Sequence, residues 1–229
     1  MRANRKLAEA LKALKRVQDK HRGVIESGDL KEVHRAILVG EGFLFPAMKG
    51  WYLCANPRDR EGGSTAWYAG FWSFLSGYLG KRFGKRYCLN VEASLLMHTR
   101  STVVPRQVTV IAREGGTSVL ALPHDTSLLI YPDDKNVPRN RMEVNGLQVL
   151  PLPETLCKLG PQAFRNHPRE AEIALNLIRD PGELLSVLLA GEGMRLKFED
   201  GESVTLHPPH DRIRFSGERP LSAELVDGP

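Results

Sequence analysis

The sequence predicts an α+β protein in which an N-terminal winged helix-turn-helix, residues 1–58, precedes a mixed α+β domain, residues 59–229. Three observations lead to this prediction. Apolar residues recur at helical spacing in several segments, short β-branched segments with turn residues alternate with those helices, and a polar, glycine-rich stretch follows the first module. The length of 229 residues suits one large domain or two small ones.

The N-terminal module is predicted from the order of its elements. Leucine and valine at helical spacing indicate an amphipathic helix over residues 4–20. A short β-branched strand follows at 24–25, then a second helical segment at about 30–40, then a hairpin over 43–53. Helix, strand, helix and hairpin in this order are typical of a winged helix-turn-helix, whose second helix enters the major groove of DNA.

The second helical segment has one apolar side and one polar side. We expect Ser27-Gly28-Asp29 to cap it. Its packed residues are predicted to be Leu30, Val33, Ile37 and Leu38.

The candidate DNA-binding residues follow from this assignment. Lys31, His34 and Arg35 are expected on the exposed side of the helix, and Lys49 at the turn of the hairpin. Arginine can pair bidentately with guanine, so Arg35 is the first candidate for a base contact, whereas Lys49 suits a phosphate. The alternative is a winged module that serves as a protein-docking or regulatory surface and binds no DNA.

Charge is distributed unevenly along the chain. The net charge is +5, but residues 1–106 hold 19 Lys and Arg against 9 Asp and Glu, whereas residues 107–229 hold 13 against 18. A basic half beside an acidic half suggests that the first part meets a polyanion, here double-stranded operator DNA. The simpler alternative is a solvated helix surface that is basic.

The second domain is predicted to begin after a polar loop at 57–63. Ser64-Thr65 can cap a helix that runs to about residue 83. Its large apolar residues fall on or near one face: Trp67, Phe71, Phe74, Leu75, Tyr78, Leu79 and Phe83. A base-stacking platform is one interpretation, but helical spacing favours a packed core.

Further elements follow to the C-terminus. Asn90 is expected to cap a helix, Asn145-Gly146 to form a hairpin turn, and Asp180 to cap a helix that opens with Pro181. The other predicted strands are residues 107–112, 118–122 and 128–131, and the other predicted helices are 152–159, 168–179 and 181–190. Residues 193–229 read as a hairpin-rich tail with a third strand at 212–215.

Motifs for catalysis are missing from the sequence. It contains no glycine-rich phosphate loop, no GxSxG and no HExxH, and its three cysteines form no CxxC pair. His207 and His210 are separated by two prolines and are expected in a solvent loop rather than at a metal. We therefore predict no enzyme, no cofactor and no metal.

The chain has no apolar run of membrane-spanning length, and its basic N-terminal segment lacks the apolar core of a secretory signal. A soluble, cytoplasmic protein is therefore expected, with no membrane partner.

Several short blocks resemble a bacterial family. They are Gly50-Trp51-Tyr52, Ser64-Thr65-Ala66-Trp67-Tyr68, Tyr87-Cys88-Leu89, Glu92-Ala93-Ser94-Leu95 and Leu152-Pro153-Glu154-Thr155-Leu156-Cys157. Through them, residues 5–192 resemble the region that precedes the catalytic domain in long Fic-type proteins, which is similar in layout to AbiEi-type antitoxins. Residues 193–229 resemble no family that can be placed from their sequence.

The resemblance implies a DNA-binding, antitoxin-like transcriptional regulator of a toxin-antitoxin or Fic-linked system, with a cognate toxin or Fic-type protein as a possible partner. The Fic catalytic signature is missing, since His167-Pro168 is followed by Arg169, so nucleotidyl transfer is not implied. The alternative is a module that binds no DNA and docks a Fic-type enzyme.

Overall fold

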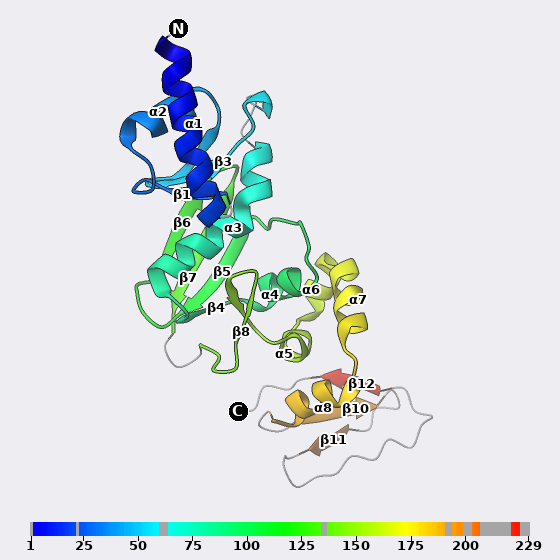
Figure 1. The fold of residues 1–229 in the computed structure, drawn as a ribbon. Helices are drawn as coiled ribbons and strands as arrows, with labels where there is room; N and C mark the ends of the chain where they lie inside the picture. The colour runs from blue at the N-terminus through cyan, green and yellow to red at the C-terminus, as the bar shows by residue number, and fades with distance from the viewer. Residues whose placement is uncertain are drawn as a thin grey trace. The chain divides into compact units, whose positions relative to one another are not determined.

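The computed structural model describes residues 2–21, 23–59, 64–133, 137–190, 194–198, 203–206 and 221–224 (Figure 1). The chain contains both helices and strands, and all strand pairs but β5–β7 are antiparallel among the described residues, so the predicted α+β class is confirmed, whereas the winged helix-turn-helix stays a prediction. The chain divides into two compact units, residues 1–150 and 151–229.

The first unit opens with the elements expected for residues 1–58. They are α1 (Arg2–His21), β1 (Val24–Glu26), α2 (Glu32–Gly40), β2 (Leu44–Met48) and β3 (Trp51–Cys54). A segment of turns at residues 27–30, rather than a further helix, joins β1 to α2.

The predicted cap of the second helix is wrong. Lys31 is the N-cap residue of α2 and its side chain makes no capping hydrogen bond. The Asp29 carboxylate instead accepts a hydrogen bond from the backbone N–H of Glu26 at 2.8 Å, within the turn. A short polar side chain of this kind can close its own turn as readily as it caps a helix, and here the turn prevails.

The sheet of this module, in the order β1-β3-β2, is covered on both faces. Alternate residues of a strand point to opposite faces. Ile25, Leu44 and Tyr52 pack with residues of α1 and α2 in one hydrophobic cluster. Val24 and Leu53, from the other face, belong to the main core around α3 (Ser64–Phe83). The sheet therefore ties the N-terminal helices to the rest of the first unit.

A second sheet of four strands has the order β4-β5-β7-β6. Its strands are β4 (Tyr87–Leu89), β5 (Gln107–Ala112), β6 (Ser118–Leu122) and β7 (Thr126–Pro132). β5 and β7 run parallel, whereas β4 and β6 pair antiparallel with them. All three strands predicted in this region are present, with β7 slightly longer than expected.

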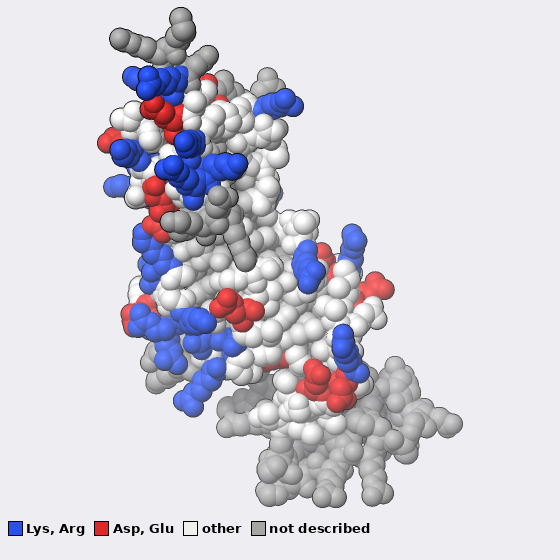
Figure 2. All heavy atoms as spheres, in the orientation of Figure 1, with Lys and Arg blue, Asp and Glu red and all other residues white. Residues whose placement is uncertain are grey.

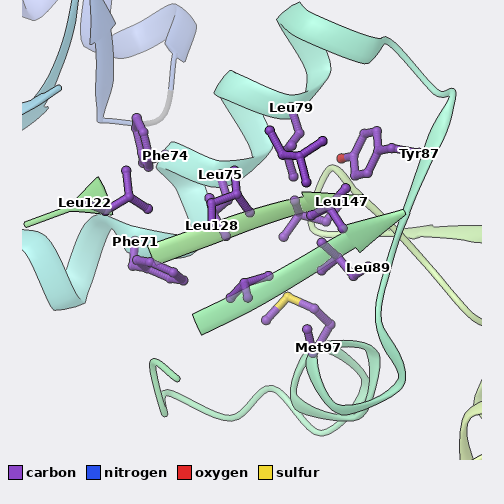
Figure 3. Close-up of a cluster of buried hydrophobic side chains, with 14 of the residues drawn as sticks. Phe71, Phe74, Leu75, Leu79, Tyr87, Leu89, Met97, Leu122, Leu128 and Leu147 are labelled. Atoms are coloured by element: carbon purple, nitrogen blue, oxygen red, sulfur yellow. The ribbon is translucent and has the colours of Figure 1, made fainter. Parts of the chain in front are cut away.

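The main core lies between α3 and this sheet, and Figure 3 shows side chains of α3 pointing toward Leu128 and Leu89 on the strands. Trp67 is fully buried, and its indole Nε1–H donates to Oγ1 of Thr126 at 3.2 Å. Phe71 meets Trp67 edge to face, with ring centroids 5.4 Å apart. The predicted apolar face of α3 is therefore mainly core, with Trp67, Phe71, Phe74 and Phe83 buried and Tyr78 half-buried, because this face packs on the strands.

The first unit also contains a helix between β4 and β5, and it ends with a hairpin. α4 (Val91–His98) begins at Asn90, whose side chain accepts a hydrogen bond from the backbone N–H of Ala93, so the predicted cap is confirmed. β8 (Met142–Val144) and β9 (Leu147–Val149) form the predicted hairpin. Asn145 and Gly146 have φ of 52° and 79°, the left-handed values that this tight turn requires.

The second unit contains α5 (Leu152–Cys157), α6 (Pro161–Asn166), α7 (Pro168–Leu177) and α8 (Pro181–Ala190). Asp180 caps α8, since its carboxylate accepts from the backbone N–H of Gly182 at 2.8 Å. β10 (Met194–Phe198) pairs antiparallel with β11 (Ser203–Leu206) and with β12 (Leu221–Glu224). The strand predicted at 212–215 lies outside the described residues.

Candidate nucleic-acid interface

The structure places the four predicted DNA-binding residues on α2 and on the β2–β3 turn. Lys31, the N-cap of α2, is exposed, and so is Lys49 at the hairpin turn. His34 and Arg35, in the first turns of α2, are half-buried.

Arg35 is bound to the backbone rather than extended into solvent. Its Nη1 donates to the carbonyl oxygens of Ser27 and Leu30, the latter at 3.1 Å. The guanidinium carbon also lies 5.8 Å from the ring centroid of Tyr52 on β3. Arg35 therefore joins α2 to the preceding turn and to the sheet.

The same turn is bonded to the hairpin. The backbone N–H of Ser27 donates to the carbonyl oxygen of Gly50 at 2.8 Å. Gly50 has a φ of +86°, which a glycine adopts without strain. Arg35, Ser27 and Gly50 thus form a chain of hydrogen bonds that holds the start of α2 beside the turn that carries Lys49. From the sequence, Ser27 was placed in a helix cap and Gly50 in a turn, but the hydrogen bond between them was not predicted, because backbone hydrogen bonds between distant turns leave no residue pattern.

The exposed side of α2 differs from the prediction. Val33 was expected to pack inward, but it is 65% exposed, whereas Leu38 is fully buried. Exposed Glu32 and Ala36 lie near Val33 on the helix. The assignment of Val33 to the packed side is therefore wrong, because the phase of this nine-residue helix follows Leu38 and its contacts with α1 and the sheet.

Basic side chains also cover the exposed side of α1. They include Arg5, Lys6, Lys12, Lys15 and Arg16. Arg5 pairs with Glu9 at 3.3 Å on the same helix. In Figure 2, lysine and arginine side chains gather over the region that α1 and α2 occupy in Figure 1, with a few acidic groups among them. This surface can attract a polyanion over distances of about one Debye length.

A second group of basic residues at the end of α3 is partly neutralised. Lys81 pairs with Glu26, Lys85 with Glu143 at 3.4 Å, and Arg86 with Glu114. Pairing with carboxylates leaves this group less suited to phosphate than the surface of α1.

Other chemical groups in the described part of the chain show no assembled site. Burial raises the pKa of the Cys54 and Cys157 thiols, which disfavours the nucleophilic thiolate. No group of three or more metal-ligating side chains occurs among the described residues, and the predicted solvent loop with His207 and His210 lies outside them. Of the helices described, none has the length and apolar character needed to cross a membrane.

Comparison with known family models finds a match to the C-terminal part of the chain. A family model described as HutD matches residues 184–229, which include most of α8 and the strands β10 to β12. No curated protein matches the chain.

These findings correct the resemblance drawn from the sequence. Nothing in them points to a Fic-type or AbiEi-type relationship, so that identification is wrong. Residues 193–229, for which the sequence suggested no family, fall inside the HutD match. The blocks behind the resemblance contain the buried residues Trp51, Trp67, Tyr87 and Leu95, whose apolar character is explained by packing in this fold.

Proposed function

We propose that residues 1–58 act as a winged helix-turn-helix that binds double-stranded DNA, and that the protein is a transcriptional regulator. The chain of hydrogen bonds from Arg35 through Ser27 to Gly50 is the observation that carries the proposal. It holds the start of a short helix and the turn of a hairpin together, as a reading helix and a backbone-contacting wing require.

Phosphate contacts are assigned to the exposed basic groups. Lys31, at the N-cap of α2, and Lys49, at the hairpin turn beside Gly50, are both exposed and present ammonium groups to solvent. The N-terminus of α2 has no side-chain cap from its N-cap residue, so its first amides and the positive end of the helix dipole favour a phosphate oxygen. Helix α1 adds a basic surface that would speed association.

Base reading is assigned to the exposed face of α2. Val33 and Ala36 present apolar groups of the kind that contact the thymine methyl in the major groove, and His34 lies beside them. Arg35, predicted from sequence as the base reader, uses its guanidinium to hold Ser27 and Leu30, so we give it a positioning role.

A salt series tests whether DNA binding occurs. Binding of the full chain to the duplex upstream of its own gene is measured by fluorescence anisotropy. We expect the logarithm of affinity to fall by about 0.9 per phosphate contact for each unit of log salt. Lys49→Ala should lower that slope by about one contact, while Lys158→Ala, at the exposed C-cap position of α5, should leave it unchanged. Absence of duplex binding at low salt would overturn the proposal and favour a protein-docking module.

A base substitution tests the reading face. Replacing thymine by uracil removes the methyl group and leaves the hydrogen-bonding edge intact. Wild-type affinity should fall by about 1 kcal/mol for each methyl that Val33 buries. Val33→Ala should bind thymine and uracil duplexes more equally. Equal discrimination by both proteins would rule out Val33 as a reader without affecting the phosphate contacts.

A further inference from the structure

Basic side chains from two separate segments meet at the end of α3. Residues 81–86, which end that helix and lead into β4, supply Lys81, Arg82, Lys85 and Arg86. Arg141, from the segment before β8, joins them, because its Nε donates to the carbonyl oxygen of Lys85 at 2.8 Å. We call these five residues the α3-end basic group. The dipole of α3 accounts for basic residues in its last turn, but not for an arginine supplied by another segment.

Two arginines of the group keep their positive charge. Arg82 is exposed, and its Nη1 donates to the hydroxyl oxygen of Tyr78 at 2.7 Å, while its guanidinium carbon lies 5.1 Å from the ring centroid of Phe83. Nη1 of Arg141 donates to the carbonyl oxygen of Pro138 at 2.7 Å. Within the described part of the chain, neither arginine pairs with a carboxylate. Neutral acceptors and aromatic rings orient a guanidinium without cancelling its charge.

The α3-end basic group adjoins the hydrogen-bond chain of the proposed DNA interface. Lys81 pairs with Glu26, the last residue of β1. The next residue, Ser27, donates its backbone N–H to Gly50 in the turn that carries Lys49. The end of α3 and the hairpin turn are therefore tied to the same short stretch of chain. On the face drawn in Figure 2, lysine and arginine side chains gather where the end of α3 and β4 lie in Figure 1, as well as over α1 and α2.

The composition of the α3-end basic group favours a polyanion over a protein partner. Phe83 is buried, so every exposed side chain of residues 81–86 is basic. The centre of a protein–protein interface is apolar and depleted of charge, which this segment is not. The fork of an arginine matches the oxygens of a phosphate, and a DNA duplex presents phosphates at regular intervals.

From this arrangement we infer that the α3-end basic group is a second phosphate-binding surface, which contacts the DNA backbone outside the segment that α2 reads. The inference rests on the proposed DNA binding by residues 1–58. It assigns Arg82 and Arg141 to phosphate oxygens. The paired members of the group contribute less, because a phosphate must first displace their carboxylates. The protein thereby covers a longer stretch of duplex than the winged module does alone, with no added base preference.

Removal of charge tests the two arginines. Binding of the full chain to the duplex upstream of its own gene, about three helical turns long, is measured by fluorescence anisotropy across a salt series. Arg82→Gln should lower the slope of log affinity against log salt by about 0.9, and adding Arg141→Gln should lower it by about 0.9 more. The matched controls Arg165→Gln and Arg169→Gln, at exposed positions of α6 and α7, should leave the slope unchanged. If Arg141→Gln unfolds the protein, Arg82→Gln alone carries the test.

A gain of charge tests the same surface in the opposite direction. Glu114→Gln removes the carboxylate that pairs with Arg86. The released guanidinium should raise the slope by about 0.9 and strengthen duplex binding at low salt. Glu172→Gln, at an exposed position of α7, removes the same charge elsewhere and should change neither quantity.

Shortening the duplex locates the second contact. As base pairs are removed from its ends, wild-type protein should lose affinity at a length at which Arg82→Gln loses none, whereas the deficit of Lys49→Ala should persist at every length. If Lys49→Ala lowers the slope but the Arg82 and Glu114 variants behave like their controls, the second contact is refuted and the winged module stands. Absence of duplex binding by the wild type would overturn both. Loss of poly-L-glutamate binding in Arg82→Gln, with duplex binding unchanged, would overturn the inference in favour of an acidic protein partner.

Discussion

Replacing Arg35 by alanine tests the hydrogen-bond chain on which the proposed interface depends. The change deletes two hydrogen bonds from a charged donor to the carbonyl oxygens of Ser27 and Leu30, and the contact with the Tyr52 ring. Hydrogen bonds that involve a charged group contribute about 1.5–3 kcal/mol each, but both bonds here use one nitrogen of a half-buried side chain. We therefore expect the free energy of unfolding to fall by about 2 kcal/mol.

Urea denaturation followed by tryptophan fluorescence measures this change, and native-state hydrogen exchange locates it. The amide of Ser27, which donates to Gly50, should lose protection in Arg35→Ala. Arg5→Ala is the matched control, because that side chain is 85% exposed and its pair with Glu9 should be worth less than about 0.5 kcal/mol. If Arg35→Ala matches this control in stability and leaves Ser27 protected, the positioning role is refuted.

Three further predictions concern the core of the first unit. Trp67→Ala should lower the free energy of unfolding by about 3–5 kcal/mol in thermal denaturation, as for other large buried side chains; a loss below about 1 kcal/mol would contradict the core assignment. Gly70→Ala should lower the free energy of unfolding by about 1–3 kcal/mol in urea denaturation, because the added Cβ would lie 2.9 Å from the buried Leu53 side chain. Gly80→Ala, on the same helix with open space around it, should raise the free energy of unfolding by about 0.5–1 kcal/mol. Equal effects of the two substitutions would refute the clash with Leu53. Burial, the largest cause, raises the pKa of the Tyr87 hydroxyl from an ordinary 10.0 to about 12, so the stability that Tyr87 contributes is full below pH 10 and is lost as the pH rises toward 12. In alkaline denaturation, Tyr87→Phe should therefore reduce the fall of unfolding free energy with pH. An unchanged fall in this variant would contradict the raised pKa of Tyr87.

The turns and helix caps that depend on neighbouring residues were predicted correctly from the sequence. The Asn145-Gly146 turn, the Asn90 cap and the Asp180 cap each depend on residues within three positions, and all three are present. The helix at 64–83 was predicted with its actual bounds, since its aromatic residues repeat at helical spacing over five turns. Such features are decided by backbone preference and side-chain reach, which the sequence carries directly.

Only part of the candidate interface could be predicted from the sequence. The exposure of Lys31 and Lys49 could be predicted, because a lysine at a helix start or a hairpin turn has no packing partner. The orientation of Val33 could not, since a nine-residue helix with apolar residues on several sides can rotate to bury different ones. The family resemblance drawn from short blocks was wrong, and those blocks contain buried residues that packing alone explains.

By itself, the sequence determined the α+β class, most element positions and the basic character of the N-terminal half, because these depend on residue type and local spacing. Only the tertiary structure decided that Arg35 holds backbone carbonyls, that Val33 faces outward, and that Arg141 joins the basic residues at the end of α3. Each of these depends on contacts between segments distant in the chain. Which side of an element faces solvent is decided when those segments pack, since burial of Leu38 and Leu53 against their neighbours outweighs the local preference of any single residue.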